Sequence, residues 1–294
     1  AEGVKIIGLN TQTFDAAKHR ALPLVADARV GLELLDTTLG DWHSAGAWTD
    51  TAASAKARWL QQAKAVTDPT NALPSDAHVI GAVHRARGSG VTLVCASGGL
   101  PGELHKLWPA GAPGSYHMEY GYSTMGYEIA GGLGVKLAKP DHDVVVMLGD
   151  GSYMMMNSEI ATSVMLGKKL TIVVLDNRGF GCINRLQMAT GGANFNNLLK
   201  DAVHEVMPEI DFVKHAEAMG AVSRKAASIA ELESALKAAE SDTRTSVIVI
   251  DTDPLIATDA GGHWWNVAVP EVSVRPEVNA ARKEYEEGLK GQRL

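Results

Sequence analysis

Short runs of β-branched apolar residues alternate along this chain with longer stretches whose apolar residues recur at helical spacing. The longer stretches over 77–86, 126–139 and 154–167 are predicted to be helices. The apolar runs are typical of buried parallel strands, and they cover 91–95, 143–148, 169–175 and 246–251. Such repeated helix–strand units predict an α/β fold: a doubly wound, mainly parallel sheet with helices on both faces.

The pattern also divides the chain into four predicted parts. A turn-rich segment at 67–74 marks the start of the main domain, which is expected to span 68–258. Residues 41–67 are expected to form a helical connector, because apolar residues over 47–66 give that stretch a loosely apolar face. Two smaller parts flank these, a segment over 1–40 and a C-terminal arm over 259–294 with a charged helix from Val278 onward.

Composition narrows the classes of protein that fit. The chain has 294 residues, 46% of them hydrophobic, enough for one good core and a smaller appendage. Its net charge of −7 and pI near 5.8 argue against a nucleic-acid partner, and no apolar run is long enough to cross a membrane. Two cysteines, Cys95 and Cys182, offer no disulfide framework, so a reduced, cytoplasmic protein is expected.

Two predicted strands end in residues that suit a metal and a phosphate. Gly149, Asp150, Gly151 and Ser152 follow the strand over 143–148, and Asn177 follows the strand over 169–175. A right-handed crossover brings such strand ends to one crevice. Carboxylate and amide oxygens suit Mg²⁺, and exposed turn amides can hold a phosphate. The alternative is two ordinary turns, but the complete ordered pattern favours a site for Mg²⁺ and a diphosphate.

This ordered pattern resembles the cofactor signature of thiamine diphosphate enzymes related to acetolactate synthase. The resemblance implies that Asp150, Asn177 and the carbonyl of Gly179 bind Mg²⁺. It also implies that Met125 wedges the cofactor into a V shape and that the carbonyl of Ser123 accepts a hydrogen bond from the aminopyrimidine. A methionine that fills a gap in the core is the alternative, and the position of Met125 before a glycine-rich helix favours the wedge.

Other candidates for the site are weaker. Ser97 and Gly98 end the strand over 91–95, so they are candidate phosphate or pyrimidine contacts, unless they form a simple strand-to-helix turn. His117, just ahead of the wedge segment, is a candidate substrate contact. His263 and Trp264 are further candidates, although packing against a neighbouring subunit is slightly favoured for the tryptophan pair at 264–265.

Nearly the whole chain resembles one branch of these enzymes, the trihydroxycyclohexane-1,2-dione hydrolases of myo-inositol catabolism. The resemblance is carried by residues 95–108, 179–187 and 261–270. It implies a C–C bond hydrolase that opens 3D-(3,5/4)-trihydroxycyclohexane-1,2-dione to 5-deoxy-glucuronic acid, with thiamine diphosphate as the electron sink. Two alternatives stay open: an acetolactate synthase-like carboligase or decarboxylase, and a non-catalytic module that binds cofactor or a partner chain.

The resemblance also concerns what this chain lacks. In such enzymes the Glu that activates the cofactor lies on a pyrimidine-binding domain, on the same or a neighbouring subunit. Residues 1–40 of this chain do not resemble that domain; they resemble only the last part of a Rossmann-like middle domain. No catalytic residue is therefore expected in this chain, and a homo-oligomer is expected. Glu119 is weighed as a substitute, and a hydrogen-bonded loop residue is preferred. Cys182 is expected to be a packing residue rather than a nucleophile.

Overall fold

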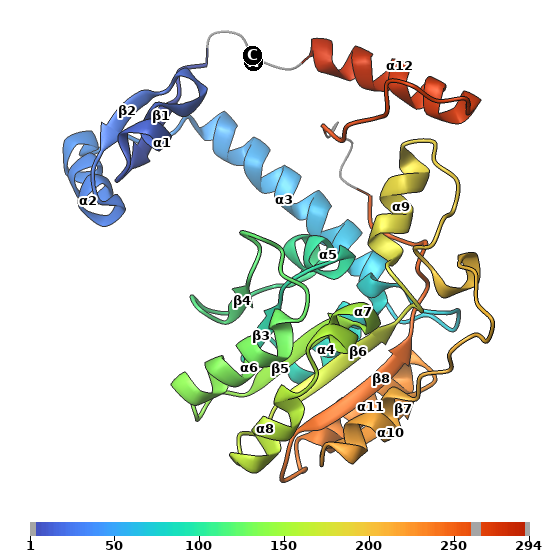
Figure 1. Ribbon diagram of the computed structural model, residues 1–294. Helices are drawn as coiled ribbons and strands as arrows, with labels where there is room; N and C mark the ends of the chain where they lie inside the picture. Colours follow the sequence, from blue (N-terminus) through green and yellow to red (C-terminus); the bar gives the residue numbers. More distant parts are fainter. Residues whose placement is uncertain (1–3, 260–265, 292–294) are drawn as a thin grey trace. The chain divides into compact units, whose positions relative to one another are not determined.

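Six parallel strands form the main sheet of the protein. They are β3 (Thr92–Cys95), β4 (Tyr116–Met118), β5 (Val144–Gly149), β6 (Thr171–Asp176), β7 (Val222–Ala226) and β8 (Ser246–Asp251). Their order across the sheet is β4-β3-β5-β6-β8-β7, with every neighbouring pair parallel (Figure 1). The structure is a computed structural model, which describes residues 4–259 and 266–291. The predicted doubly wound parallel fold is confirmed.

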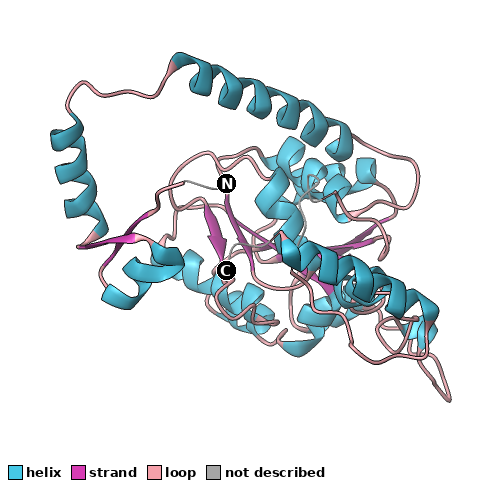
Figure 2. Ribbon diagram, turned by 90° about the horizontal axis from the view of Figure 1, so that it is seen from above, coloured by secondary structure: helices cyan, strands magenta, loops and turns pink. Residues whose placement is uncertain are grey.

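Helices cover both faces of this sheet, which explains why its inner strands are mainly apolar and almost wholly buried (Figures 1 and 2). On one face Val144, Val146 and Leu148 of β5 join a buried cluster with Ile129 and Tyr153. That face carries α6 (Tyr127–Ala138), α7 (Asp150–Met155), α8 (Glu159–Met165) and α10 (Phe212–Ala218). The helices packed on the other face are α4 (Asp76–Arg87), α5 (Gly99–Leu107) and α11 (Ile229–Ala239).

Three more elements complete this part of the chain, two between β6 and β7 and one after β8. They are α9 (Gly181–Ala189), the 3₁₀ turn η2 (Leu199–Asp201) and α12 (Pro276–Lys290). The start of α12 packs on the turn after α9, where Arg275 Nε donates to the Gly191 carbonyl at 3.2 Å and Val278 is buried. The predicted charged C-terminal helix is therefore present, beginning two residues earlier than expected.

The N-terminal unit, Ala1–Trp59, contains a small parallel sheet of its own, and Leu60–Leu294 form the second unit. Its elements are β1 (Ile7–Asn10), α1 (Thr13–Ala17), the 3₁₀ turn η1 (Lys18–Arg20), β2 (Leu22–Val25), α2 (Ala28–Leu39) and the start of α3 (Gly46–Thr67). Among its described residues only Ala16 and Gly31 are buried, while Phe14 and Leu22 are exposed. This unit therefore has too little buried apolar surface for a core of its own.

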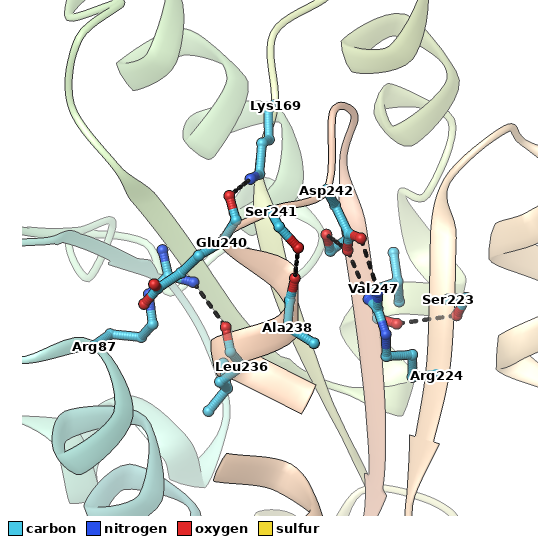
Figure 3. Close-up of polar contacts among 11 residues, drawn as sticks. Arg87, Lys169, Ser223, Arg224, Leu236, Ala238, Glu240, Ser241, Asp242 and Val247 are labelled. Carbon is cyan, nitrogen blue, oxygen red and sulfur yellow. Dashed lines mark hydrogen bonds and ion pairs between the residues drawn. The ribbon is translucent and has the colours of Figure 1, made fainter. Parts of the chain in front are cut away.

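A polar network lies at the amino ends of β6, β7 and β8 (Figure 3). Asp242 accepts hydrogen bonds from Arg224 at 2.6 and 2.8 Å and from Ser246 at 2.6 Å. Lys169 Nζ donates to the carbonyl of Glu240 at 2.9 Å, so the end of α11 is fixed beside the start of β6. This network stabilises the edge of the sheet opposite to the one where β5 and β6 end.

Two predictions from the pattern were inaccurate. The single helix expected over 154–167 is wrong, because α7 ends at Met155 and α8 begins only at Glu159. The side-chain amide of Asn157 donates to the Tyr153 carbonyl at 3.1 Å, which satisfies the end of α7 and interrupts the helix. Strand β4 was not predicted, since three residues are too few for a visible period. Within the described residues, no helix is both long and apolar enough to span a membrane.

Candidate functional site

The carboxyl ends of β3, β5 and β6 meet at one edge of the sheet. Strand β5 pairs with β3 on one side and with β6 on the other, and Gly149 lies in register with Leu175. Asp150 and Asn177 come directly after neighbouring strand ends, as the parallel crossover requires. The two candidate metal ligands, distant in the sequence, are thus brought to the same place.

Asp150 is buried, and only one of its oxygens has a partner. Its Oδ2 accepts a hydrogen bond from the Gly179 amide at 2.9 Å. Its Oδ1 is buried with no hydrogen-bond partner, and the same is true of Asn177 Oδ1. Burial, and then the neighbouring charge of Asp176, raise the pKa of Asp150 from 3.8 to about 7.

These unpartnered oxygens fit a bound Mg²⁺. A buried polar atom without a partner is costly, and native structures rarely leave one without a reason. Here Asp150 Oδ1 and Asn177 Oδ1, one carboxylate and one amide oxygen, are hard donors of the kind that Mg²⁺ prefers. A divalent cation would satisfy both atoms and favour the ionised form of Asp150, against the effect of burial.

A cavity of about 200 Å³ opens beside these oxygens. It is lined by all ten residues predicted to contact the cofactor or the metal: Ser97, Gly98, Ser123, Met125, Gly149, Asp150, Gly151, Ser152, Asn177 and Gly179. They come from the turns after β3, β5 and β6 and from the loop before α6. These ten residues come from four separate stretches of sequence, and the fold brings all four to one cavity.

The wall of the cavity is built by close contacts between these segments. The hydroxyls of Ser97 and Ser123 lie 3.1 Å apart, which joins the turn after β3 to the loop before α6. A methyl group placed on Gly151 would lie 3.3 Å from Met125 Cε, so the Met125 side chain reaches across to the start of α7. The cavity can therefore offer a diphosphate-binding turn on one side and an apolar support on the other.

A family comparison matches this region. Residues 96–250 match the family described as thiamine pyrophosphate enzyme, C-terminal TPP binding domain; thiamine pyrophosphate is another name for thiamine diphosphate. The chain belongs to this family. The matched range runs from the turn after β3 to the penultimate residue of β8, so it contains every residue that lines the cavity except Asp76.

Curated relatives of this thiamine pyrophosphate-binding chain carry one name. The protein named 3D-(3,5/4)-trihydroxycyclohexane-1,2-dione hydrolase from Geobacillus thermodenitrificans is 38% identical over 97% of this chain and 49% of its own length. A protein of the same name from Halalkalibacterium halodurans is 34% identical over 98% of this chain and 49% of its own. The chain thus spans about half the length of the curated relatives it matches.

Two solved structures resemble this chain in fold. A thiamine diphosphate-dependent 4-hydroxybenzoylformate decarboxylase from Rhodococcus jostii RHA1 superposes with a TM-score of 0.66, at 19% identity, over 86% of this chain and 44% of that chain. Benzoylformate decarboxylase from Polynucleobacter necessarius gives a TM-score of 0.55 at 22% identity, over 64% of this chain and 34% of that chain. At these identities the likeness concerns the fold.

Of the three candidate substrate contacts, only His117 lies among the described residues, and it is not at this cavity. His117 lies on β4, outside the cavity lining, and its Nε2 is 2.6 Å from the Tyr127 hydroxyl, with the two rings stacked. His263 and Trp264 lie outside the described residues. The described part of the chain therefore brings together the cofactor and metal candidates, while His117 is engaged with Tyr127.

Glu119 and Cys182, considered above as catalytic groups, have surroundings that suit other roles. Glu119 accepts hydrogen bonds from the amides of Tyr122 and Thr124 at 3.0 and 2.7 Å, which lower the pKa of its exposed carboxyl. It is a loop residue of the kind expected, one that shapes the approach to Met125. Cys182 lines the cavity, but burial raises the pKa of its thiol, so the nucleophilic thiolate is disfavoured.

Two buried carboxyl groups at the cavity were missed by the sequence reasoning. Asp76, the first residue of α4, lines the cavity, and burial raises its pKa from 3.8 to about 6, an effect that the nearby Arg185 opposes. Glu128, in the first turn of α6, is fully buried beneath the cavity wall. Both are acidic residues in otherwise apolar buried helix segments, and that contrast is the signal by which a sequence could indicate them.

Proposed function

We propose that this chain binds thiamine diphosphate and Mg²⁺ and forms the C-terminal half of an enzyme that hydrolyses the C–C bond between the carbonyls of a cyclic 1,2-diketone. One observation carries the proposal: Asp150 and Asn177, each with an unpartnered buried oxygen, line the same cavity as all the predicted cofactor residues. The name shared by the relatives, 3D-(3,5/4)-trihydroxycyclohexane-1,2-dione hydrolase, supplies the substrate class.

Each wall of the cavity has a proposed role. Asp150, Asn177 and the Gly179 carbonyl hold Mg²⁺, and the amides of Gly151 and Ser152 hold the diphosphate. On the other side the Ser123 carbonyl orients the aminopyrimidine. Ser97 and Gly98 complete the contacts, while Met125 supports the bent cofactor. When bound, thiamine diphosphate supplies the electron sink that C–C cleavage beside a carbonyl requires.

The proposal assigns the remaining chemistry to a second domain. The Glu that activates the cofactor is expected on a pyrimidine-binding domain of the same or a neighbouring subunit, in a homo-oligomer. The fact that this chain spans 49% of its relatives is consistent with that division of labour. Cys95 and Cys182 are free in the structure, which supports a reducing, cytoplasmic location.

The first experiment is a calorimetric titration of the chain with thiamine diphosphate, with and without Mg²⁺. We expect saturable, Mg²⁺-dependent heat in the wild type and an affinity at least about 100-fold weaker in Asp150→Ala, since a lost metal ligand weakens binding more than a lost supporting contact. Asp251→Asn is the matched control, because Asp251 ends the neighbouring strand β8 and lies outside this cavity. Wild-type binding that Asp150→Ala leaves unchanged would refute the metal assignment.

If the wild type gives no binding heat with cofactor and Mg²⁺, the titration is repeated in the presence of the pyrimidine-binding half of a relative. Binding restored by that half confirms the site, and continued silence refutes it. The assembled protein is then given the cyclic diketone or pyruvate. Release of a ring-opened acid from the diketone supports the hydrolase, whereas condensation of pyruvate supports a carboligase.

A further inference from the structure

Glu128 is a buried carboxyl group that the proposed function leaves without a role. It lies in the first turn of α6, and its exposed fraction is 0%. The rest of this helix is made largely of glycine and apolar residues, which pack against β3 and β5. Burying an isolated carboxylate is very costly, so a glutamate at this position needs specific partners.

Its partners come from three separate segments of the chain. Glu128 Oε1 accepts from the Ser97 amide at 3.3 Å, in the turn after β3. Its Oε2 accepts from the amide of Gly126 at 3.0 Å, which follows Met125 directly. The side chain of Ser152 in α7 forms a third hydrogen bond with the carboxylate. Each of these three segments contributes residues to the cofactor cavity.

The partners of the carboxyl group favour its ionised form. Two backbone N–H groups can only donate, and the Ser152 side chain acts in the same direction by lowering the pKa of Glu128. The ionised form accepts from the Ser97 amide on one oxygen and from the Gly126 amide on the other, whereas protonation would weaken one of these bonds. Burial raises the pKa of Glu128, and these hydrogen bonds act in the opposite direction. The charged hydrogen bonds are also stronger than neutral ones.

We infer that Glu128 is a positioning residue, which fixes the turn after β3, the Met125 loop and the start of α7 relative to one another. The inference rests on the proposed function, because it concerns the fit of thiamine diphosphate. In the proposed function the cofactor contacts Ser123 and Met125 of the loop before α6 and Gly151 and Ser152 of α7, all of which line the cavity. A cavity whose walls are held at a fixed separation binds such a ligand with less loss of conformational freedom.

The test compares Glu128→Gln with Asp242→Asn. Asp242 is a matched control, because it also accepts three hydrogen bonds but lies in the network at the opposite edge of the sheet (Figure 3). Hydrogen exchange of the cofactor-free chain is measured first. We expect Glu128→Gln to raise exchange together in peptides covering 96–99, 123–127 and 150–153. The control should raise it around 222–226 and 242–248 instead.

Ligand binding gives the second readout, with two probes in the presence of Mg²⁺. Glu128→Gln should weaken the binding of thiamine diphosphate about 10- to 100-fold, the range typical of a lost supporting contact. Inorganic diphosphate is expected to contact only the diphosphate-binding turn, so its binding should weaken several-fold less. A general loss of stability would weaken both probes equally, as the control variant would show.

Several outcomes would overturn the inference. Exchange that rises evenly over the whole domain, or only at the start of α6, contradicts a role in joining three segments. Equal weakening of both probes does the same. If Glu128→Gln does not fold, Glu128→Asp keeps the charge but shortens the arm, and the same pattern is expected. A wild type that binds neither probe, alone or with the pyrimidine-binding half of a relative, refutes the proposed function, and the exchange pattern alone then decides the role of Glu128.

Discussion

Replacing Asp76 with asparagine should stabilise the protein above neutral pH. Asp76 is 8% exposed, and no side-chain hydrogen bond to the described residues satisfies its carboxylate. Burial raises its pKa from 3.8 to about 6, while Arg185 offsets part of the effect. The folded state therefore holds the proton more tightly than the unfolded state does. That contribution to stability is complete below about pH 4 and is lost as the pH rises through about 6.

The size of the effect follows from the two pKa values. A rise from 3.8 to about 6 corresponds to about 3 kcal/mol between the limits of low and high pH. Asparagine stays neutral and avoids this loss. It also gives up the favourable position of a negative charge in the first turn of α4, which is worth about 0.5 kcal/mol. The expected net gain in the free energy of unfolding is about 2 kcal/mol at pH 8 and much smaller at pH 4.5.

Urea unfolding followed by circular dichroism at pH 4.5 and pH 8 measures this difference. Asp242→Asn is the control of opposite sign, because hydrogen bonds from Arg224 lower the pKa of Asp242. Its carboxylate stabilises the fold at pH values above the unfolded pKa, and that stabilisation is lost as the pH falls. We expect Asp242→Asn to lose about 1–3 kcal/mol at pH 8. An Asp76→Asn variant that is less stable than the wild type at pH 8 would refute the reasoning.

Four further substitutions test the packing in and near the site. Gly179→Ala should abolish cofactor binding and destabilise the fold by about 1–3 kcal/mol, because φ is +148° and a methyl group would strike the backbone of the loop after α9; calorimetry and urea unfolding check this. Gly132→Ala should lower the free energy of unfolding by about 1–2 kcal/mol, measured by thermal unfolding, because its methyl group would crowd a β5 valine. Gly134→Ala, in open space on the same helix, should raise the free energy of unfolding by up to about 1 kcal/mol. Tyr153→Phe removes a 3.0 Å hydrogen bond to His215 and should lose about 1 kcal/mol, with cofactor affinity unchanged.

The metal and cofactor candidates could be located from the sequence because they sit at strand ends. Hydrophobic runs mark β5 and β6, so Asp150 and Asn177 are placed by the elements that precede them. Parallel topology then does the rest, since it brings consecutive carboxyl ends to one edge. No knowledge of side-chain contacts is needed for a prediction of this kind.

Asp76 and Glu128 could not be predicted in this way. Each lies within a helix, and its importance comes from which segments pack around it, which no local period records. Glu128 contacts Ser97, 31 positions earlier in the sequence, and this contact exists only once the sheet is assembled. The division of 150–165 into two helices was missed for a related reason, since it depends on one side chain, that of Asn157.

The place of β8 in the sheet has a consequence for how the chain is made. This strand is the last of the six to be synthesised, yet it lies between β6 and β7. A nascent chain that has emerged only as far as β7 therefore has no partner for that strand, and the apolar edge of β6 stays open. Such edges pair readily with other chains. Completion of the sheet must wait until residue 251 leaves the ribosome, so the interval before it is when the open edge of β6 is available for pairing with other chains.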